Sequence, residues 1–135
     1  MTVYYKSQFL TVSANDSLSL VITEWDEMTK KMHERRFKDE IVLAYDVIAL
    51  KKPKFYLLNT ENLYFQVPQE EQKWVNDNFM SKLSEFGVQK MAIFNNKFET
   101  IQGSFRETMQ KNVSCELAFF KTQAEAYQWF GIEMS

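Results

Sequence analysis

Apolar positions in the middle of the chain change from a continuous run to a helical period and back again. The run Phe55-Tyr56-Leu57-Leu58 predicts a short strand that is covered on both faces. An apolar stripe with spacings of four, four and three follows, made of Val75, Phe79, Leu83 and Phe86. Pro68 and Gly87 suit the start and the left-handed end of the predicted helix, and the residues from Val88 to Phe94 predict the next strand. This order is a βαβ unit, whose crossover we expect to be right-handed.

Alternating positions before this unit predict two strands joined as a hairpin. Apolar residues of the first strand are Val3, Tyr5 and Phe9, those of the second are Leu18, Leu20 and Ile22, and the turn cluster Asn15-Asp16-Ser17 precedes the second. The first strand would suit a sheet edge. The polar segment from Trp25 to His33 has no clear period and predicts a loop or a frayed first turn. From Glu34 to Leu50 the period becomes helical, with an apolar face of Phe37, Ile41, Ala44, Tyr45 and Ile48.

Two helices and one strand are predicted after the central unit. Asn95-Asn96 would cap a helix with the apolar positions Phe98, Ile101, Phe105 and Met109. Residues Cys115 to Phe120 predict a strand, and Thr122-Gln123-Ala124-Glu125 is a capping box for the last helix. The order β-β-α-β-α-β-α-β-α predicts one α/β domain over residues 1–135, with a mixed, mostly parallel sheet and an antiparallel N-terminal hairpin.

The composition fits one globular domain with little net charge. Of the 135 residues 45% are hydrophobic, and 16 basic against 18 acidic residues give a net charge of −2. This balance favours neither nucleic acid nor an anionic membrane as a partner. We interpret the basic cluster from Lys30 to Lys38, which Glu34 interrupts, as the solvated start of a helix rather than a phosphate-binding patch.

Several features predict a cytoplasmic location. No apolar run approaches the length of a membrane span. The residues from Met1 to Leu10 lack the charged start and apolar run of a signal peptide. Cys115, the single cysteine, excludes an intramolecular disulfide, so nothing suggests an oxidising compartment.

Four segments give the chain a family resemblance. The strand Lys52–Thr60, the helix segment Gln72-Lys73-Trp74-Val75, the residues Phe86–Ala92 and the closing Ala124–Phe130 resemble the SpoIIAA-like, or STAS, proteins. The likeness covers nearly the whole chain after Leu18 and is closest to small stand-alone bacterial members. It rests on hydrophobic patterns rather than on catalytic motifs. The resemblance implies a STAS-type fold and a regulatory or protein-interaction role.

One departure from the family concerns regulation by phosphorylation. Regulatory members carry an Asp-Ser pair, with the serine phosphorylated, where the loop after the central strand enters the next helix. That position reads Phe65-Gln66-Val67-Pro68-Gln69-Glu70 in this chain, without Ser or Thr. Glu70 and Glu71 would also repel a phosphate. The sequence therefore predicts a domain without the usual phosphoacceptor.

Residues with catalytic or metal-binding chemistry are sparse. A Cys-His dyad would need Cys115 and the single histidine, His33, and we favour a core thiol and an exposed imidazole instead. A metal site would have to be built from carboxylates, and no calcium-binding loop motif occurs. None of the three glycines lies between a strand and the helix after it, as a phosphate cradle requires. We therefore expect a non-enzymatic protein with no catalytic residues, metal or cofactor.

A small-ligand site is predicted at the carboxyl ends of the strands, where open α/β sheets bind ligands. The candidate residues are Asn59, Thr60, Gln66, Asn95 and Asn96, all uncharged and able to hydrogen-bond. The alternative interpretation is that these side chains only cap helices and turns.

The loop that contains Gln66 also has an unusual sequence. Residues Glu61 to Gln66 read Glu-Asn-Leu-Tyr-Phe-Gln, which resembles the recognition sequence of tobacco etch virus protease. Val67 follows where that protease prefers a small residue. We interpret the match as a coincidence in which Leu63, Tyr64 and Phe65 close the edge of the core.

These observations lead to two functional hypotheses. The first is a non-enzymatic STAS-type interaction or regulatory domain that binds a protein partner or a second copy of itself. The second is a carrier or sensor of a small amphipathic or lipid-like ligand. An exposed apolar patch would favour the first hypothesis, and a closed apolar cavity would favour the second.

Overall fold

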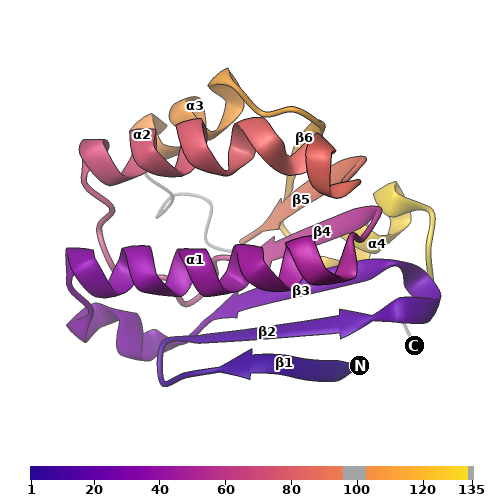
Figure 1. The fold of residues 1–135 in the computed structure, drawn as a ribbon, viewed down its shortest axis with the longest axis horizontal. Coiled ribbons are helices and arrows are strands. Elements are labelled where there is room, and N and C mark those ends of the chain that lie inside the picture. Colours follow the sequence, from indigo (N-terminus) through magenta and orange to yellow (C-terminus); the bar gives the residue numbers. More distant parts are fainter. Residues whose placement is uncertain (96–102, 134–135) are drawn as a thin grey trace.

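The structure is a computed structural model that describes residues 1–95 and 103–133, and it is built around one six-stranded sheet (Figure 1). The strands are β1 (Thr2–Lys6), β2 (Leu10–Asn15), β3 (Leu20–Trp25), β4 (Phe55–Asn59), β5 (Lys90–Phe94) and β6 (Glu116–Phe120). The helices are α1 (Glu34–Lys51), α2 (Gln69–Asn78), α3 (Gly103–Lys111) and α4 (Gln123–Phe130). Short 3-10 helices cover Asp16–Leu18, Glu27–Lys31 and Met80–Phe86. The predicted α/β class is confirmed.

Strands that follow one another in the chain are neighbours in the sheet. The first three strands form an antiparallel meander, and β3, β4, β5 and β6 are all parallel. A crossover containing α1, α2 or α3 joins each parallel pair. The carboxyl ends of β3 to β6 therefore lie at one end of the sheet, because parallel strands share their direction.

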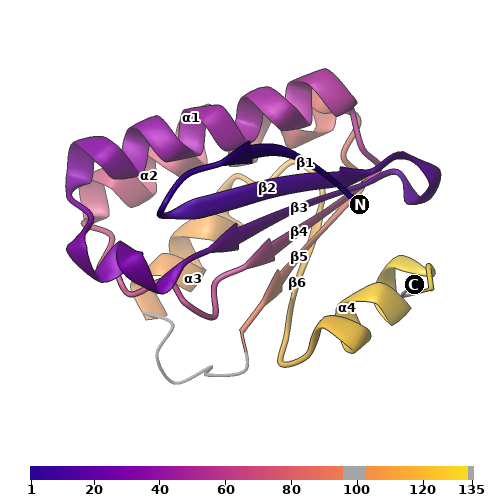
Figure 2. The same cartoon turned by 90° about the horizontal axis from the view of Figure 1, so that it is seen from below.

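Helices cover the two faces of the sheet unequally. Figure 2 shows α1, α2 and α3 on one face and α4 on the other. In β4, Tyr56 and Leu58 join the core under α1 and α2, while Leu57 joins the second core under α4. The rings of Phe55 and Phe130 stack there with centroids 5.0 Å apart. Burial on both faces explains why this strand is a continuous apolar run.

The N-terminal part contains one strand more than the sequence analysis predicts. Strand β2 buries Leu10, Val12 and Ala14 on the α1 side of the sheet. A tight turn before it is held by Ser7, whose Oγ accepts hydrogen bonds from the backbone N–H groups of Phe9 (3.0 Å) and Leu10 (3.2 Å). The predicted antiparallel N-terminal hairpin is confirmed as β2 and β3, but a chain reversal at Ser7 splits the proposed first strand and adds β1 beside it.

The central helix is also interrupted. One helix from Pro68 to Phe86 is predicted, but α2 ends at Asn78 and a 3-10 helix follows Phe79. Near the break, Asn78 Nδ2 donates to the Trp74 carbonyl (2.9 Å) and Ser81 Oγ donates to the Asp77 carbonyl (2.7 Å). Side chains that bond to helix carbonyls in this way compete with the backbone ladder. The rings of Phe79 and Tyr45 pack with their centroids 4.3 Å apart, and this contact holds the irregular turn against α1.

Most predicted helix ends are confirmed. Gly87 has a φ of +92°, which is the left-handed conformation that favours glycine. Thr122 Oγ1 accepts from the Glu125 backbone N–H (3.1 Å), as the capping box predicts, and its hydroxyl donates to the Glu125 carboxylate (3.0 Å). Helix α1 begins at Glu34 and buries all five predicted apolar residues.

Two predicted segments differ from the structure or fall outside it. The segment from Trp25 to His33 is partly ordered, because β3 extends to Trp25 and Asp26 caps the 3-10 helix Glu27–Lys31 through a 3.0 Å bond from the Met28 N–H to Asp26 Oδ1. The cap residue Asn96 and the apolar positions Phe98 and Ile101 of the third predicted helix lie outside the described residues.

Candidate functional site

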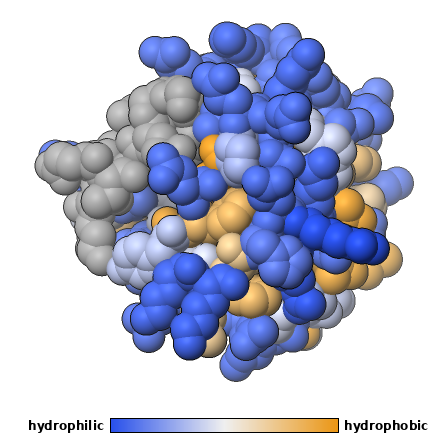
Figure 3. Space-filling model, turned by 90° about the vertical axis from the view of Figure 1, so that its left-hand side faces the viewer, coloured by the Kyte–Doolittle hydropathy of each residue, from blue (hydrophilic) through white to orange (hydrophobic). Residues whose placement is uncertain are grey.

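The predicted ligand site lies at the carboxyl ends of the parallel strands. This end is on the left in Figure 1, and Figure 3 shows it as a surface with apolar residues near its middle and along its right edge, between polar ones. Of the five candidate residues, Asn59, Thr60, Gln66 and Asn95 are described, and Asn96 lies outside the described residues.

Thr60 and Asn95 are brought together by the parallel pairing of β4 and β5. The Asn95 side-chain amide donates to both the carbonyl and the hydroxyl oxygen of Thr60, each over 3.2 Å. The Thr60 backbone N–H donates to the Phe94 carbonyl (3.0 Å), and both side chains are buried. These contacts join the ends of two neighbouring strands, a role that differs from the predicted capping of helices and turns.

Asn59 and Gln66 do not join this pair. Asn59 Oδ1 accepts from the Glu61 N–H over 2.9 Å and so caps the turn that leaves β4. Gln66 is exposed in the loop before α2. The structure therefore connects two of the four described candidates, uses a third in a turn and leaves the fourth at the surface.

The protease-like loop is attached to the core by alternate residues. Leu63 and Phe65 pack against the core, and the Phe65 ring stacks on Phe37 with centroids 5.4 Å apart. Buried Thr29 holds the backbone on both sides of Leu63. Its hydroxyl donates to the Asn62 carbonyl (2.9 Å) and accepts from the Tyr64 N–H (2.8 Å). The predicted structural role is confirmed for Leu63 and Phe65, whereas Tyr64 is 49% exposed.

A small enclosed cavity lies in the core between the sheet and the helices. Its volume is about 20 Å³, and its lining includes Thr23, Tyr45, Tyr56, Leu63 and Met109. A cavity of this size holds roughly one water molecule, whereas small-molecule sites are hundreds of Å³ in volume.

Cys115 and His33 lie at opposite ends of the sheet. His33 is exposed directly before α1, which follows the carboxyl end of β3, and Cys115 directly precedes β6 at its amino end. Burial raises the pKa of the Cys115 thiol to about 11, so it is protonated at neutral pH. This placement rules out a Cys-His dyad.

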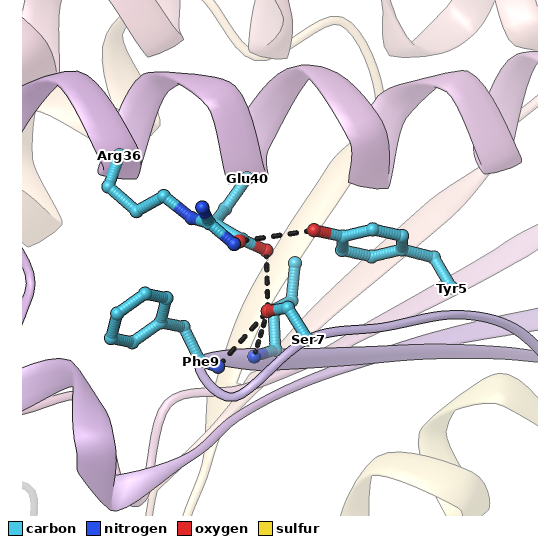
Figure 4. Close-up of polar contacts among 6 residues, drawn as sticks. Tyr5, Ser7, Phe9, Arg36 and Glu40 are labelled. Carbon is cyan, nitrogen blue, oxygen red and sulfur yellow. Dashed lines mark hydrogen bonds and ion pairs between the residues drawn. The ribbon is translucent and has the colours of Figure 1, made fainter.

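A polar cluster around the buried carboxylate of Glu40 was missed by the sequence analysis. The Glu40 side chain in α1 is fully buried and accepts from Tyr5 Oη (3.1 Å), Ser7 Oγ (3.0 Å) and Arg36 Nε (2.9 Å), as Figure 4 shows. Burial is the main cause that raises the pKa of the Tyr5 hydroxyl, and its hydrogen bond to Glu40 raises this pKa further. The available signal was the position of Glu40 between the apolar residues Phe37 and Ile41, with Arg36 one turn earlier. The cluster ties the first turn of the sheet to α1.

Exposed apolar side chains concentrate on two adjacent elements. The large hydrophobic residues exposed in the described part are Met1, Val3, Tyr4, Val42, Leu43, Leu50 and Tyr64. All except Tyr64 belong to β1, to the residue before it, or to α1, and α1 packs beside β1. Val3 pairs with Ser13, which alternates with the α1-side residues Val12 and Ala14, so Val3 faces the other side of the sheet. We call the exposed residues Tyr4, Val42, Leu43 and Leu50 the α1–β1 surface. The sequence pattern carried no signal for this concentration.

Searches for a metal site, a membrane span and known relatives were negative. In residues 1–95 and 103–133, no three His, Cys, Asp or Glu side chains gather in a way that could hold a metal ion. None of the helices described there has both the length and the apolar character needed to cross a bilayer. No family model matches the chain, and neither a curated protein nor a solved structure matches it.

Proposed function

We propose that this chain is a non-enzymatic interaction domain of the STAS type, which binds a partner protein in the cytoplasm. The mixed, mostly parallel sheet with its antiparallel N-terminal strands supports the fold part of this proposal. The fold alone does not define a function, so the functional part rests on the surface.

The observation that carries the proposal is the α1–β1 surface. Isolated exposed apolar residues are ordinary, but neighbouring ones on adjacent elements are typical of interaction sites. Leu50 is 69% exposed and Tyr4 is 41% exposed, although both belong to regular elements that could have carried polar residues there. Tyr4 is fixed in place, because Lys51 Nζ donates to its hydroxyl over 3.0 Å and also lies 4.9 Å from its ring centroid. A preformed apolar surface of this kind costs little side-chain entropy on binding.

The proposed interaction does not depend on a phosphoserine at the usual family position. Helix α2 starts at Gln69 after Pro68, and Glu70 and Glu71 occupy its first turn. Thr60, the nearest serine or threonine upstream, is buried and bonded to Asn95. We therefore propose that binding is controlled by the presence of the partner rather than by phosphorylation at this loop.

The alternative function, a carrier of a small amphipathic ligand, has weaker support. A carrier needs an enclosed space that matches its ligand, and the enclosed core cavity described above has a volume of about 20 Å³. The candidate residues Thr60 and Asn95 bond to each other. The interaction domain remains the better supported function.

Native mass spectrometry on gently purified protein tests the proposal. We expect a co-purified polypeptide with the unchanged chain, and its loss when Leu43 and Leu50 are both replaced by Ser. Tyr64→Ser removes an apolar side chain that is exposed elsewhere and should leave the complex intact. A stoichiometric small-molecule adduct, a bare monomer, or a complex that survives the double substitution would contradict the proposal.

A further inference from the structure

One stripe of α1 alternates leucine with aspartate at the spacing of a coiled-coil seam. Its residues are Asp39, Leu43, Asp46 and Leu50, separated by four, three and four positions, and all four are exposed. We call them the Asp-Leu stripe. Residues at this spacing face one neighbouring helix along their whole length. Helix α1 thus has a buried face on the sheet and, facing outward, an exposed stripe with the spacing of a coiled-coil seam.

The Asp-Leu stripe borders a groove beside the edge of the sheet. The groove has a volume of about 420 Å³, and its lining includes Tyr5 from β1 and Asp39 and Leu43 from the stripe. Glu40 and Arg36 also line it, but they bond to each other over 2.9 Å. A rod-shaped partner lying along α1 would therefore contact leucine and aspartate on one side and β1 on the other.

The unpaired charges of this stripe are negative. Two basic residues near it already have partners, since Arg36 pairs with Glu40 and Lys51 Nζ lies 2.7 Å from Asp16 Oδ1. Arg35 lies one turn before Asp39, at the amino end of the helix and outside the stripe. Within the described residues neither Asp39 nor Asp46 forms an ion pair. A partner that desolvates the leucines must also bring positive charge to these carboxylates, because an unpaired buried carboxylate is costly.

A second copy of this chain does not satisfy that requirement. In an antiparallel pair of α1 helices each leucine would pack opposite an aspartate of the other copy. In a parallel pair the aspartates would face each other, and like charges in contact repel. The stripe therefore selects against self-association along α1.

We propose that the Asp-Leu stripe docks an amphipathic helix of a partner protein, with leucine-like side chains opposite Leu43 and Leu50 and Lys or Arg opposite Asp39 and Asp46. This inference rests on the proposed function and specifies the chemistry of the partner. Apolar contact supplies the affinity, and the two carboxylates set the register and exclude acidic helices.

The test uses the full chain and two synthetic helical peptides of 18 residues. In both peptides, leucine occupies the repeated seam position that would face Leu43 and Leu50. The repeated position that would face Asp39 and Asp46 is lysine in the first peptide and glutamate in the second. We expect fluorescence anisotropy to give at least ten-fold tighter binding of the lysine peptide. The double variant Asp39→Lys/Asp46→Lys should reverse this preference. The double variant Leu43→Ser/Leu50→Ser should lower the affinity for the lysine peptide at least ten-fold.

A matched control separates the stripe from general charge attraction. Asp77→Lys/Glu85→Lys makes the same change in net charge at exposed residues outside α1, and it should keep the preference for the lysine peptide. Absence of binding, equal affinity for both peptides, or the same reversal in the control would overturn the inference. If neither peptide binds but co-purification of the polypeptide still depends on Leu43 and Leu50, the proposed function is supported. Only the inference about a basic amphipathic helix is then wrong.

Discussion

Tyr5 in β1 donates a hydrogen bond to the carboxylate of Glu40 in α1 over 3.1 Å, although the two residues are 35 positions apart in the chain. The same carboxylate accepts from Ser7 and Arg36, so each of its oxygens has a donor. Because the Ser7 oxygen also accepts from two backbone N–H groups, one buried carboxylate organises both the turn before β2 and the position of the helix. A buried charge is tolerated when all its hydrogen bonds are made. If the carboxylate were removed, its donors would lose their acceptor, and that loss costs free energy of unfolding.

Removal of the Glu40 carboxylate should therefore destabilise the fold. Glu40→Ala leaves the partly buried hydroxyls of Tyr5 and Ser7 without their acceptor and should lower the free energy of unfolding by about 1–3 kcal/mol. Asp46→Ala changes an exposed carboxylate of the same helix and should cost less than about 0.5 kcal/mol. Chemical denaturation of both variants measures the difference. Equal stabilities would mean that the cluster contributes nothing.

Asn95 should matter to the fold more than Asn59. Asn95→Leu removes the donor to the buried Thr60 oxygens and should cost about 1–3 kcal/mol of unfolding free energy. Asn59→Leu removes one bond in a half-buried turn and should cost roughly half as much. Thermal or urea unfolding gives both values. The opposite order would mean that the Thr60–Asn95 bridge is not the main role of Asn95.

The protease-like loop should resist cleavage in the folded protein. Tobacco etch virus protease needs an extended substrate, whereas Leu63 and Phe65 are packed and the backbone between them is bonded to Thr29. Thr29→Val removes that hydroxyl without changing the recognition sequence, so we expect cleavage after Gln66 to become about ten-fold faster. Gel analysis of a time course measures the rates, and Gln66→Ala serves as the uncleaved control. Rapid cleavage of the unchanged protein would show that the loop is not held.

Cys115 should react slowly with alkylating reagents. Its thiol pKa is raised from 9.0 to about 11 by burial, and thiolate is the reactive form. At pH 8 the native thiolate fraction is lower than in the unfolded chain, so alkylation should be about 100-fold slower, even before steric protection is considered. The native rate should continue to rise between pH 9 and pH 10, and a plateau there would contradict the raised pKa. Mass spectrometry of this single cysteine gives the rate directly.

The same pKa shift makes a prediction for stability. A group whose folded pKa is raised stabilises the folded state below its unfolded pKa, and that contribution is lost as the pH rises through the folded value. For Cys115 the loss should fall between about pH 9 and pH 11. Cys115→Ala should therefore show a shallower decline in stability over this range, which urea denaturation at several pH values can measure.

The sequence alone determined the elements that depend on local patterns. Helix α1, the buried strand β4, the left-handed end at Gly87 and the capping box at Thr122 are encoded by residues within one or two turns of each other. Their physical causes, which are apolar periodicity, backbone freedom and side-chain caps, act over the same short range. The parallel part of the sheet followed from the order of these elements.

Only the tertiary structure decided which polar residues meet. The Thr60–Asn95 and Tyr5–Glu40 pairs each join residues 35 positions apart, and no local pattern distinguishes a bridging asparagine from a ligand-binding one. The turn at Ser7 also depends on a carboxylate from another element, so the reversal that creates β2 could not be seen in the N-terminal alternation. The exposed stripe on α1 became meaningful only when packing showed which face of that helix the sheet already covers. Packing decides these features because it brings together groups whose separation along the chain is set by the fold.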